Sequence, residues 1–186
     1  MEFTPLSNQL LVAMPAMRDP NFERTVSLLC QHDENGSLGV VINRRIEDFS
    51  LADVLEHLEI PPGEVAPGRP VFSGGPVHPE LGMVLHDYAG DWQSTLRVGE
   101  HLGLTTSLDI MQAMSRGEVP GRSLMVLGYA GWGSGQLEHE LQENAWLCAP
   151  ADPQVIFETP VEERWSRAAG QLGIDLLTIS PDAGHA

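Results

Sequence analysis

The sequence predicts a single α/β (α+β) domain over residues 1–186, with a mixed β-sheet flanked by about four helices. Short apolar runs are interspersed with amphipathic segments, without the strict alternation of a doubly wound parallel sheet. A chain of 186 residues fits one domain. The hydrophobic content of 42% is typical of a globular protein and too high for a disordered one.

Eight segments have the length and composition of strands. The polar turn at residues 33–36 separates the second from the third and ends in Asn-Gly, which is a strong hairpin signal. The expected strands cover residues 10–14, 25–30, 38–42, 71–72, 81–85, 95–98, 123–127 and 155–157.

Four segments have the signals of helices. Ser50 and Ser107 each precede an amphipathic run, and Thr159 is followed by proline and glutamate, as at a helix start that continues to about Leu172. A fourth helix is expected from about residue 134 to residue 144. Residues 60–70 hold four prolines and two glycines and are expected to form a surface loop.

The charge balance argues against direct DNA binding. Ten basic residues stand against 26 acidic ones, which gives a formal net charge of −16. Such a chain repels phosphate backbones, whereas DNA affinity depends largely on cationic contacts. Every basic side chain is arginine, so Schiff-base chemistry and a phosphate-binding P-loop lysine are excluded.

A cytoplasmic location is expected. No apolar run approaches the roughly 20 residues that span a bilayer, and the N-terminus lacks the features of a signal peptide. Cys30 and Cys148 lie far apart and outside any Cys-x-x-Cys motif, as expected for free thiols in a reducing compartment. Cys30 is predicted to be a buried structural thiol; its alternative role is that of a redox sensor.

The most informative segment is residues 128–138, which contain four glycines and two aromatic residues between an apolar run and a helix. Such a glycine cluster indicates positive φ angles or a backbone that approaches something closely. One interpretation is a tight turn that packs Trp132 against the sheet, and the other is a ligand or partner surface. The candidate binding residues here are Tyr129, Gly131, Trp132, Gly133 and Gln136.

A second glycine segment, formed by Gly74, Gly75 and Pro76, also follows an apolar strand. It permits close backbone approach and ends strand pairing, because proline lacks an N–H. We expect it to face the Trp132 segment across a groove. A tight turn without a ligand role is the alternative.

Four ordered motifs carry a resemblance to a known family. Residues 19–26 (DPNFERTV), residues 39–44 (GVVINR), residues 74–77 (GGPV) and residues 128–138 follow each other along the chain, and Gly184-His185-Ala186 closes it. Together they resemble the YqgE/AlgH family, also called UPF0301 or DUF179, over essentially the whole chain. One position departs, since Arg45 stands where the family usually has proline.

This resemblance implies a bacterial cytosolic protein with a mixed sheet partly curled into a barrel-like shape. It also carries the family label of transcriptional regulator, which comes from an alginate-regulation phenotype, and no established chemistry. If the protein affects transcription, we expect an indirect effect because of its charge.

Arg24 and Asn43 are the polar residues that most resemble binding residues, because each adjoins an apolar strand. Arg24 could clamp a carboxylate and Asn43 could pair with an amide or with backbone. The alternative is an ion pair from Arg24 to Asp19 or Glu23, and a turn-capping role for Asn43.

No metal or cofactor site is expected. The seven histidines form no His-Glu-x-x-His motif, and the glycines after residue 128 have neither the dinucleotide spacing nor the Gly-Lys-Ser/Thr of a P-loop. No Gly-x-Ser-x-Gly nucleophile motif is present. The sequence therefore favours a non-enzymatic regulatory or binding protein with an unknown protein or small-molecule partner. The alternatives are an enzyme using Arg24, Asn43 and either His78 or His86, and a thiol sensor.

Overall fold

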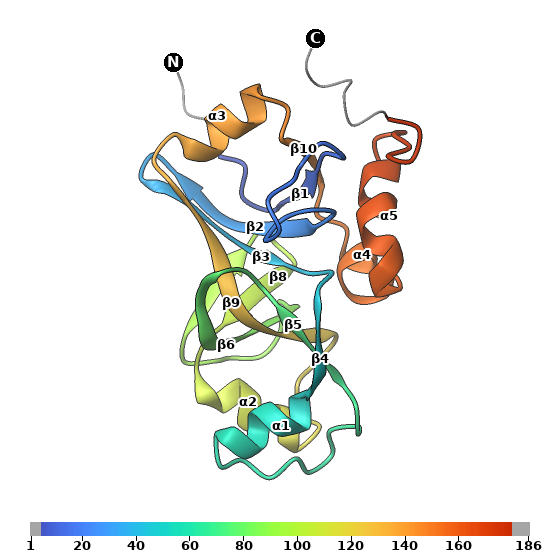
Figure 1. Ribbon diagram of the computed structural model, residues 1–186. Helices are drawn as coiled ribbons and strands as arrows, with labels where there is room; N and C mark the ends of the chain where they lie inside the picture. Colours follow the sequence, from blue (N-terminus) through green and yellow to red (C-terminus); the bar gives the residue numbers. More distant parts are fainter. Residues whose placement is uncertain (1–4, 180–186) are drawn as a thin grey trace.

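This computed structural model describes residues 5–179, which contain ten β-strands, five α-helices and one 3₁₀ helix (Figure 1). The closing Gly184-His185-Ala186 lies outside the described residues. The strands are β1 (Gln9–Ala13), β2 (Val26–Asp33), β3 (Gly36–Val41), β4 (Arg45–Ser50), β5 (Pro70–Ser73), β6 (Val77–Asp87), β7 (Thr95–Val98), β8 (Leu102–Thr105), β9 (Ser123–Gly133) and β10 (Trp146–Pro150). The helices are α1 (Leu51–His57), α2 (Leu108–Ser115), α3 (Gln136–Gln142), α4 (Pro153–Phe157), η1 (Val161–Glu163) and α5 (Arg164–Gly170).

One curled sheet contains all the described strands in the order β10-β1-β2-β3-β9-β6-β8-β7, with β5 beside β9 and β4 beside β5. The long strand β9 joins its two halves. Its last residues, 130–133, pair with β3, whereas its first residues pair with β6 and, in parallel, with β5. The sheet is therefore mixed, as predicted, and it curls into the half-barrel that the resemblance implied (Figure 1).

Both faces of the upper half of the sheet are buried. Leu10 and Val12 of β1 belong to the largest part of the core, against α4 and α5, because successive side chains of a strand point to opposite faces. Leu11 and Ala13 belong to a second part of the core, beneath α3. A third part lies at the other end of the molecule, between the sheet and helices α1 and α2 (Figure 1).

Helix α1 begins where the sequence predicts. The Asp53 carboxylate accepts from the Ser50 N–H at 2.8 Å, and the Ser50 hydroxyl accepts from the Asp53 N–H at 3.4 Å. This capping box joins α1 directly to the end of β4. The lower part of β4 therefore lies against the first turn of α1.

The C-terminal region differs from the prediction in two places. Residues 155–157 form helix α4 instead of a strand, because Asp152 caps the preceding turn by accepting from the Gln154 N–H at 2.9 Å. The expected cap Thr159 instead donates its hydroxyl to the Gln154 carbonyl, so η1 precedes α5 and the α-helix begins only at Arg164. Val155 is buried within α4, and its packing outweighs its β propensity.

Strands β4, β8 and β10 were not predicted. β4 is charged, β8 is short and contains Gly103, and β10 follows a helix without a turn signal. Each of these strands is stabilised by pairing with another strand: β4 with β5, β8 with β6 and β10 with β1. The periodicity of a strand's own residues does not reveal such a pairing. Across residues 5–179, no helix combines the length and the apolar character that a bilayer crossing requires.

Candidate functional site

The glycine-rich segment after Leu127 is not a loop, because β9 continues through it to Gly133. Its residues pair with β3, from Ala130 opposite Gly39 to Gly133 opposite Gly36. A Cβ atom on Gly39 would lie 3.3 Å from Cζ3 of Trp132, so the indole lies directly over this glycine. The glycines here let two strands and an indole approach closely. The segment is therefore not the tight turn of the first interpretation, although Trp132 does pack against the sheet as that interpretation predicts.

Trp132 is sealed inside the upper part of the core, with 5% of its surface exposed. Its ring stacks on Phe22 at a centroid distance of 6.0 Å and meets Trp146 edge-on at 6.0 Å. A depression of about 260 Å³ that touches the indole is otherwise lined by residues between 31 and 38, and it contains no residue of the 74–76 segment. The predicted recess between Trp132 and Gly74, Gly75 and Pro76 is therefore wrong, because the rings of Phe22 and Trp146 fill the space beside the indole.

The two glycine segments nevertheless lie side by side, joined through backbone. The Gly74 N–H donates to the Leu127 carbonyl at 2.8 Å. A side chain on Gly75, whose φ is 153°, would collide with the backbone of Tyr129. This contact closes the junction between β5 and β9 and leaves no room for a ligand between the two backbones.

Asn43 holds the turn before β2, as its turn-capping interpretation predicts. Its amide donates to the Arg24 carbonyl at 3.0 Å and accepts from the Val26 N–H at 3.0 Å. Arg24 is exposed, and its guanidinium carbon lies 4.8 Å from the centroid of the Trp165 ring. Within the described chain it forms no ion pair with Asp19 or Glu23, so that alternative is wrong, and stacking on an indole takes its place.

Cys30 is buried, and burial raises the pKa of its thiol to about 12. A thiol with this pKa is protonated at neutral pH and lacks the reactive thiolate that a sensor needs. Burial also raises the pKa of the half-buried Cys148. The structure thus supports the structural role of Cys30 over the redox role.

The remaining candidate residues have local contacts. Gln136 is exposed and its side-chain oxygen accepts from the Gly133 N–H at 3.0 Å, which links the start of α3 to the end of β9. The Tyr129 ring is half-buried and lies 6.0 Å from the ring of His78. Gly131 is exposed beside them on β9.

His86 is buried in a network of its own. Its Nδ1 lies 2.7 Å from the Asp87 carbonyl and its Nε2 lies 2.7 Å from the Thr105 hydroxyl, which is 2.8 Å from the Thr95 hydroxyl. Burial lowers the pKa of His86 and keeps the ring neutral. Within residues 5–179, no contact joins this network to Arg24 or Asn43, so the side chains of the enzyme alternative do not converge.

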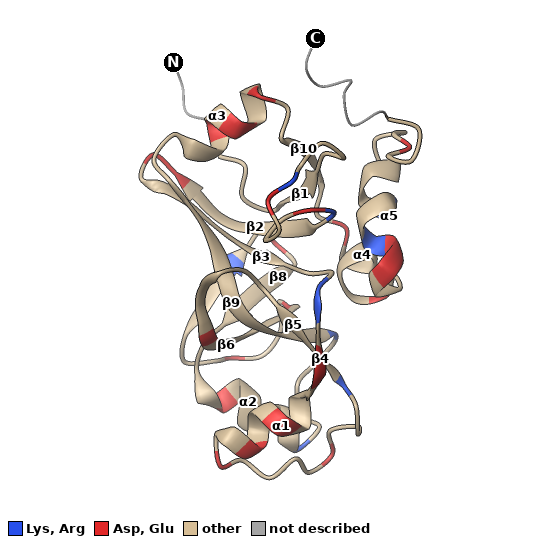
Figure 2. Cartoon of the chain, in the orientation of Figure 1, with Lys and Arg blue, Asp and Glu red and all other residues tan. Residues whose placement is uncertain are grey.

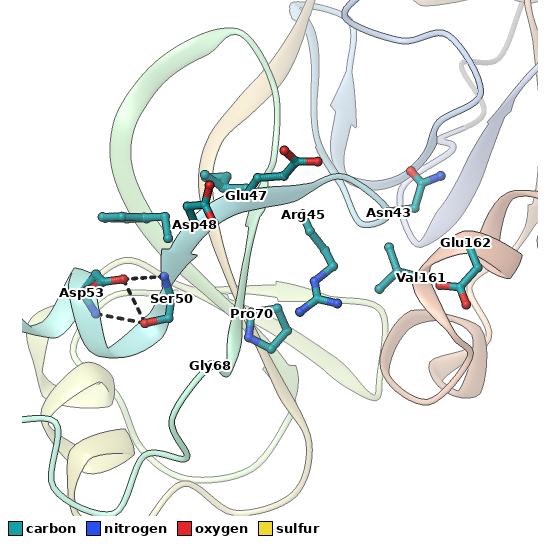
Figure 3. A pocket seen from close by; sticks show the side chains of 12 residues that line it. Asn43, Arg45, Glu47, Asp48, Ser50, Asp53, Gly68, Pro70, Val161 and Glu162 are labelled. Atoms are coloured by element: carbon teal, nitrogen blue, oxygen red, sulfur yellow. Dashed lines mark hydrogen bonds between the residues drawn. The ribbon is translucent and has the colours of Figure 1, made fainter.

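A charged cleft of about 720 Å³ lies between β4 and the η1 helix (Figure 3). Figure 3 shows the Arg45 guanidinium directed into it, with Pro70 on one side and Val161 on the other. The charged residues that line the charged cleft are Arg45, Glu47, Asp48, Asp53 and Glu162. From the sequence, Arg45 was named as the departure from the family pattern, Asp53 as part of a helix cap and Glu162 as part of a solvated helical turn, and none of them was assigned to a site.

Most of these charges have no partner. Asp53 is committed to Ser50, whose hydrogen bonds lower the pKa of its carboxyl. Arg45, Glu47, Asp48 and Glu162 form no hydrogen bond or ion pair through their side chains with any other described residue. Unpaired carboxylates thus outnumber the single unpaired guanidinium in the charged cleft.

Behind Arg45 lies the buried Arg164. Its guanidinium donates to the Thr159 carbonyl at 2.9 Å and to the Ile42 carbonyl at 2.6 Å, and it lies 5.2 Å from the Phe72 ring. Burial, together with the positive charge of Arg45, lowers the pKa of Arg164 to about 10. Arg164 therefore joins the segment before η1, the residue after β3 and strand β5 behind the charged cleft.

β4 presents an open edge to the charged cleft. It pairs with β5 at Arg45 and at Ser50 only, and the ladder is interrupted between them. Asp48 has a φ of 55°, which bends the strand there. No other described strand lies beside β4.

An apolar groove of about 430 Å³ adjoins the charged cleft and lies between α1, α2 and the start of β6. Leu58, Leu81 and Leu108 line it and are 40%, 38% and 52% exposed. They are half of the six large hydrophobic residues that are exposed in residues 5–179. Phe49 lines both the apolar groove and the charged cleft, so the two depressions meet at its side chain.

Sequence reasoning missed the apolar groove. A single exposed leucine is ordinary and carries no signal, and Leu58, Leu81 and Leu108 come from three separate segments of the chain. Only the packing of α1 and α2 on the sheet brings them together (Figure 1).

The fold and these depressions define a class of protein: a one-domain α/β protein with a curled, half-barrel sheet and two adjoining surface depressions. The model of the AlgH-like family, DUF179, matches residues 10–177. The chain therefore belongs to the AlgH-like (UPF0301) family, as the resemblance predicted.

Relatives and solved structures agree with this assignment. UPF0301 proteins of Xanthomonas campestris and Xanthomonas axonopodis are 53% and 54% identical over 184 residues, which cover 98% of this chain and 97% of each relative. The solution structure of the AlgH protein from Pseudomonas aeruginosa is similar with a TM-score of 0.81 and 47% identity, over 100% of this chain and 98% of that one. A protein of Corynebacterium diphtheriae, with a TM-score of 0.70, 24% identity and coverage of 90% and 87%, shares the fold.

Proposed function

We propose that this protein is a non-enzymatic binding protein, which holds a basic amphipathic segment of a partner protein in the apolar groove and the charged cleft. The observation that carries this proposal is their junction at Phe49, where exposed leucines adjoin unpaired carboxylates. A surface of this composition suits a segment with both apolar and basic side chains.

Charge complementarity determines the kind of partner. The chain has a formal net charge of −16. Figure 2 shows acidic residues on α1, on α2 and at the lower end of β4, around the two depressions. An acidic partner is repelled by this field, and a basic one is attracted and steered. Glu47 and Asp48 are placed to receive lysine or arginine side chains, because neither has an internal partner.

The apolar groove supplies the second part of the recognition. Leu58, Leu81 and Leu108 would lose their exposed surface to the partner, which contributes about 25 cal/mol per Å² of apolar area removed from water. The open edge of β4 also offers backbone groups to an extended segment. The same arrangement supports an indirect role in regulation, through a protein partner and not through DNA.

The test uses two synthetic peptides of equal length, one alternating leucine with lysine and one alternating leucine with glutamate. We expect the basic peptide to shift amide resonances around residues 45–58, 80–82 and 106–111 of the labelled protein, and the acidic peptide to leave them unchanged. Leu108→Asp should weaken binding at least tenfold. The matched control Leu172→Asp, at another exposed leucine (42%), should bind as the wild type does.

A second pair of variants isolates the electrostatic part. Replacing Glu47 with Gln and Asp48 with Asn should weaken the basic peptide and flatten its dependence on salt. Glu100→Gln removes an exposed carboxylate outside the charged cleft and should change neither. Equal binding of both peptides would show that charge plays no part in the recognition, and equal loss in Leu108→Asp and Leu172→Asp would show that net charge alone is recognised. Either result would refute the proposal.

A further inference from the structure

A third depression, of about 380 Å³, differs from the rest of this acidic surface. It is lined by Arg69, Met114, Gly117, Val119, Gly121, Arg122, Ser123 and Phe157, which include two arginines and no aspartate or glutamate. In a chain with 26 acidic and ten basic residues, such a lining is unexpected from composition. We call this depression the arginine pocket.

Arg69 carries an uncompensated charge in the arginine pocket. One of its amino groups, Nη2, donates to the Ser123 carbonyl at 3.0 Å and to the Ser123 hydroxyl at 2.7 Å. Within the described part of the chain, no carboxylate lies at ion-pair distance from Arg69. Its side chain is half-buried, and burial lowers the pKa of its guanidinium, which shows that the charge is only partly solvated.

Arg122 is held rigidly beside it. Two of its nitrogens donate to the Asp87 carboxylate at 3.0 and 2.9 Å, and a third lies 3.4 Å from the Glu158 carboxylate. These two acidic residues offset the charge of Arg122 from outside the lining. Its guanidinium also lies 5.2 Å from the centroid of the Phe157 ring. Arg122 therefore forms a fixed wall, and Arg69 supplies the charge that remains free.

Hydrogen-bond donors and an apolar wall complete the arginine pocket. The Ser123 hydroxyl accepts from Arg69, so its own hydrogen is available to a ligand. The Nε and Nη1 groups of Arg69 make no hydrogen bond within residues 5–179, so each leaves an N–H donor for an oxyanion. Met114, Val119 and Phe157 provide apolar surface next to these donors.

We propose that the arginine pocket binds a small organic anion, whose phosphate or carboxylate group is held by Arg69 and Ser123 while its apolar part packs on Met114, Val119 and Phe157. This site is separate from the apolar groove and the charged cleft, with which it shares no lining residue. The charge of the site and the size of the arginine pocket favour a ligand of metabolite size over a polypeptide.

The test titrates the labelled full-length protein with phenyl phosphate, benzoate, inorganic phosphate and benzylamine, and follows amide resonances by NMR. Phenyl phosphate or benzoate should cause saturable shifts at residues 117–123, inorganic phosphate weaker ones, and the cation benzylamine none. The stronger of the first two identifies the oxyanion as a phosphate or a carboxylate. An absence of saturable shifts with both at millimolar concentration overturns the proposal.

Variants locate the binding. Arg69→Gln should weaken the preferred anion at least tenfold, and Arg69→Lys, which keeps the charge and loses the planar guanidinium with its separate donors, should weaken it less. The control Arg97→Gln removes an exposed arginine that stacks on Tyr88 and should bind as the wild type does. Equal binding by Arg69→Gln and the wild type overturns the proposal.

Arg69 also bonds to the backbone of Ser123, so each variant is first checked by its thermal melting curve. If Arg69→Gln does not fold, Val119→Glu decides the question, because it places a carboxylate in the arginine pocket and leaves Arg69 and Ser123 intact. This variant should abolish anion binding. Undiminished binding by folded Val119→Glu refutes the proposal.

Discussion

The two ends of the molecule differ in how they expose large hydrophobic side chains. At the α3 end, Trp132, Trp146 and Phe22 lie on one another and close the core, with Trp132 and Trp146 only 5% and 3% exposed. At the α1–α2 end, Leu58 and Leu108 remain exposed beside a groove. The α3 end, which we call the closed end, contains the glycine- and aromatic-rich segment. The α1–α2 end, which we call the open end, has no comparable motif in its sequence.

This difference shows what an unusual local sequence reports. The glycines near Trp132 are required for packing, since they let β3, β9 and an indole approach one another. Residues that bind a partner need only be exposed together, and ordinary leucines meet that condition when helices bring them side by side. The ordered set of motifs therefore identified the family and the fold, whereas the apolar groove lies at the other end of the molecule from Trp132.

The largest expected effect is at the closed end. Trp132→Ala should lower the free energy of unfolding by about 3–5 kcal/mol, because it removes the ring that contacts both Phe22 and Trp146. Trp92→Ala, at a half-buried indole of the other end, should cost about 1–2 kcal/mol. Urea denaturation measures both, and similar losses in the two variants would contradict the contrast between a sealed ring and a peripheral one.

The backbone junction between the glycine segments should be nearly as sensitive. Gly75→Ala should cost about 2–3 kcal/mol, since the new Cβ meets the Tyr129 backbone at a φ that side chains rarely adopt. Gly170→Ala is the matched control at the end of α5, where a Cβ meets nothing within 4 Å. It should stabilise the protein by about 0.5–1 kcal/mol. A neutral Gly75→Ala would mean that the backbone of Gly75 does not lie against that of Tyr129.

The sequence was sufficient to predict those elements that depend on local residue patterns. The hairpin at residues 33–36, the capping box at Ser50 and the strand at residues 95–98 are present as predicted. It was insufficient where tertiary packing decides, as at Val155, which is buried in a helix, and at the charged strand β4, which is held by β5.

The same difference between local and tertiary determinants applies to the candidate site residues. The structural role of Cys30 was predicted from its apolar neighbours in sequence, and the turn-capping role of Asn43 was the alternative given to its role as a binding residue. The apolar groove and the arginine pocket each combine residues from several distant segments, so no spacing in the chain announces them. Their discovery needs the relative positions of α1, α2, β6 and the loops around Arg69.

A third experiment concerns the buried middle of the sheet, where His86 should make the stability of the protein depend on pH. The folded state lowers the pKa of His86 below its ordinary value of 6.5, so the folded state binds this proton less readily than the unfolded one does. Stability from His86 is fully present above pH 6.5 and is lost as the pH falls below it, with a slope of at most about 1.4 kcal/mol per pH unit.

His86→Gln should flatten this part of the stability profile, measured by urea denaturation at several pH values. His78→Gln, at a histidine whose side chain is 64% exposed, should leave the profile as in the wild type. If both variants retain the wild-type slope, the acid sensitivity arises elsewhere and His86 is not held neutral by its burial.

The smallest effect is expected for Leu108→Ala, and its comparison with Leu137→Ala contrasts the two ends most directly. Leu108 and Leu137 both lie in the first turn of a short helix, but Leu108 is 52% exposed at the apolar groove, whereas Leu137 is 0% exposed beneath α3. Leu137→Ala should cost about 2–5 kcal/mol and Leu108→Ala no more than about 0.5 kcal/mol. A small loss in Leu108→Ala would leave the Leu108 side chain free for the contact with a partner that we propose. If Leu108→Ala instead destabilises the protein as much as Leu137→Ala does, then the apolar groove is closed in solution and Leu108 belongs to the core.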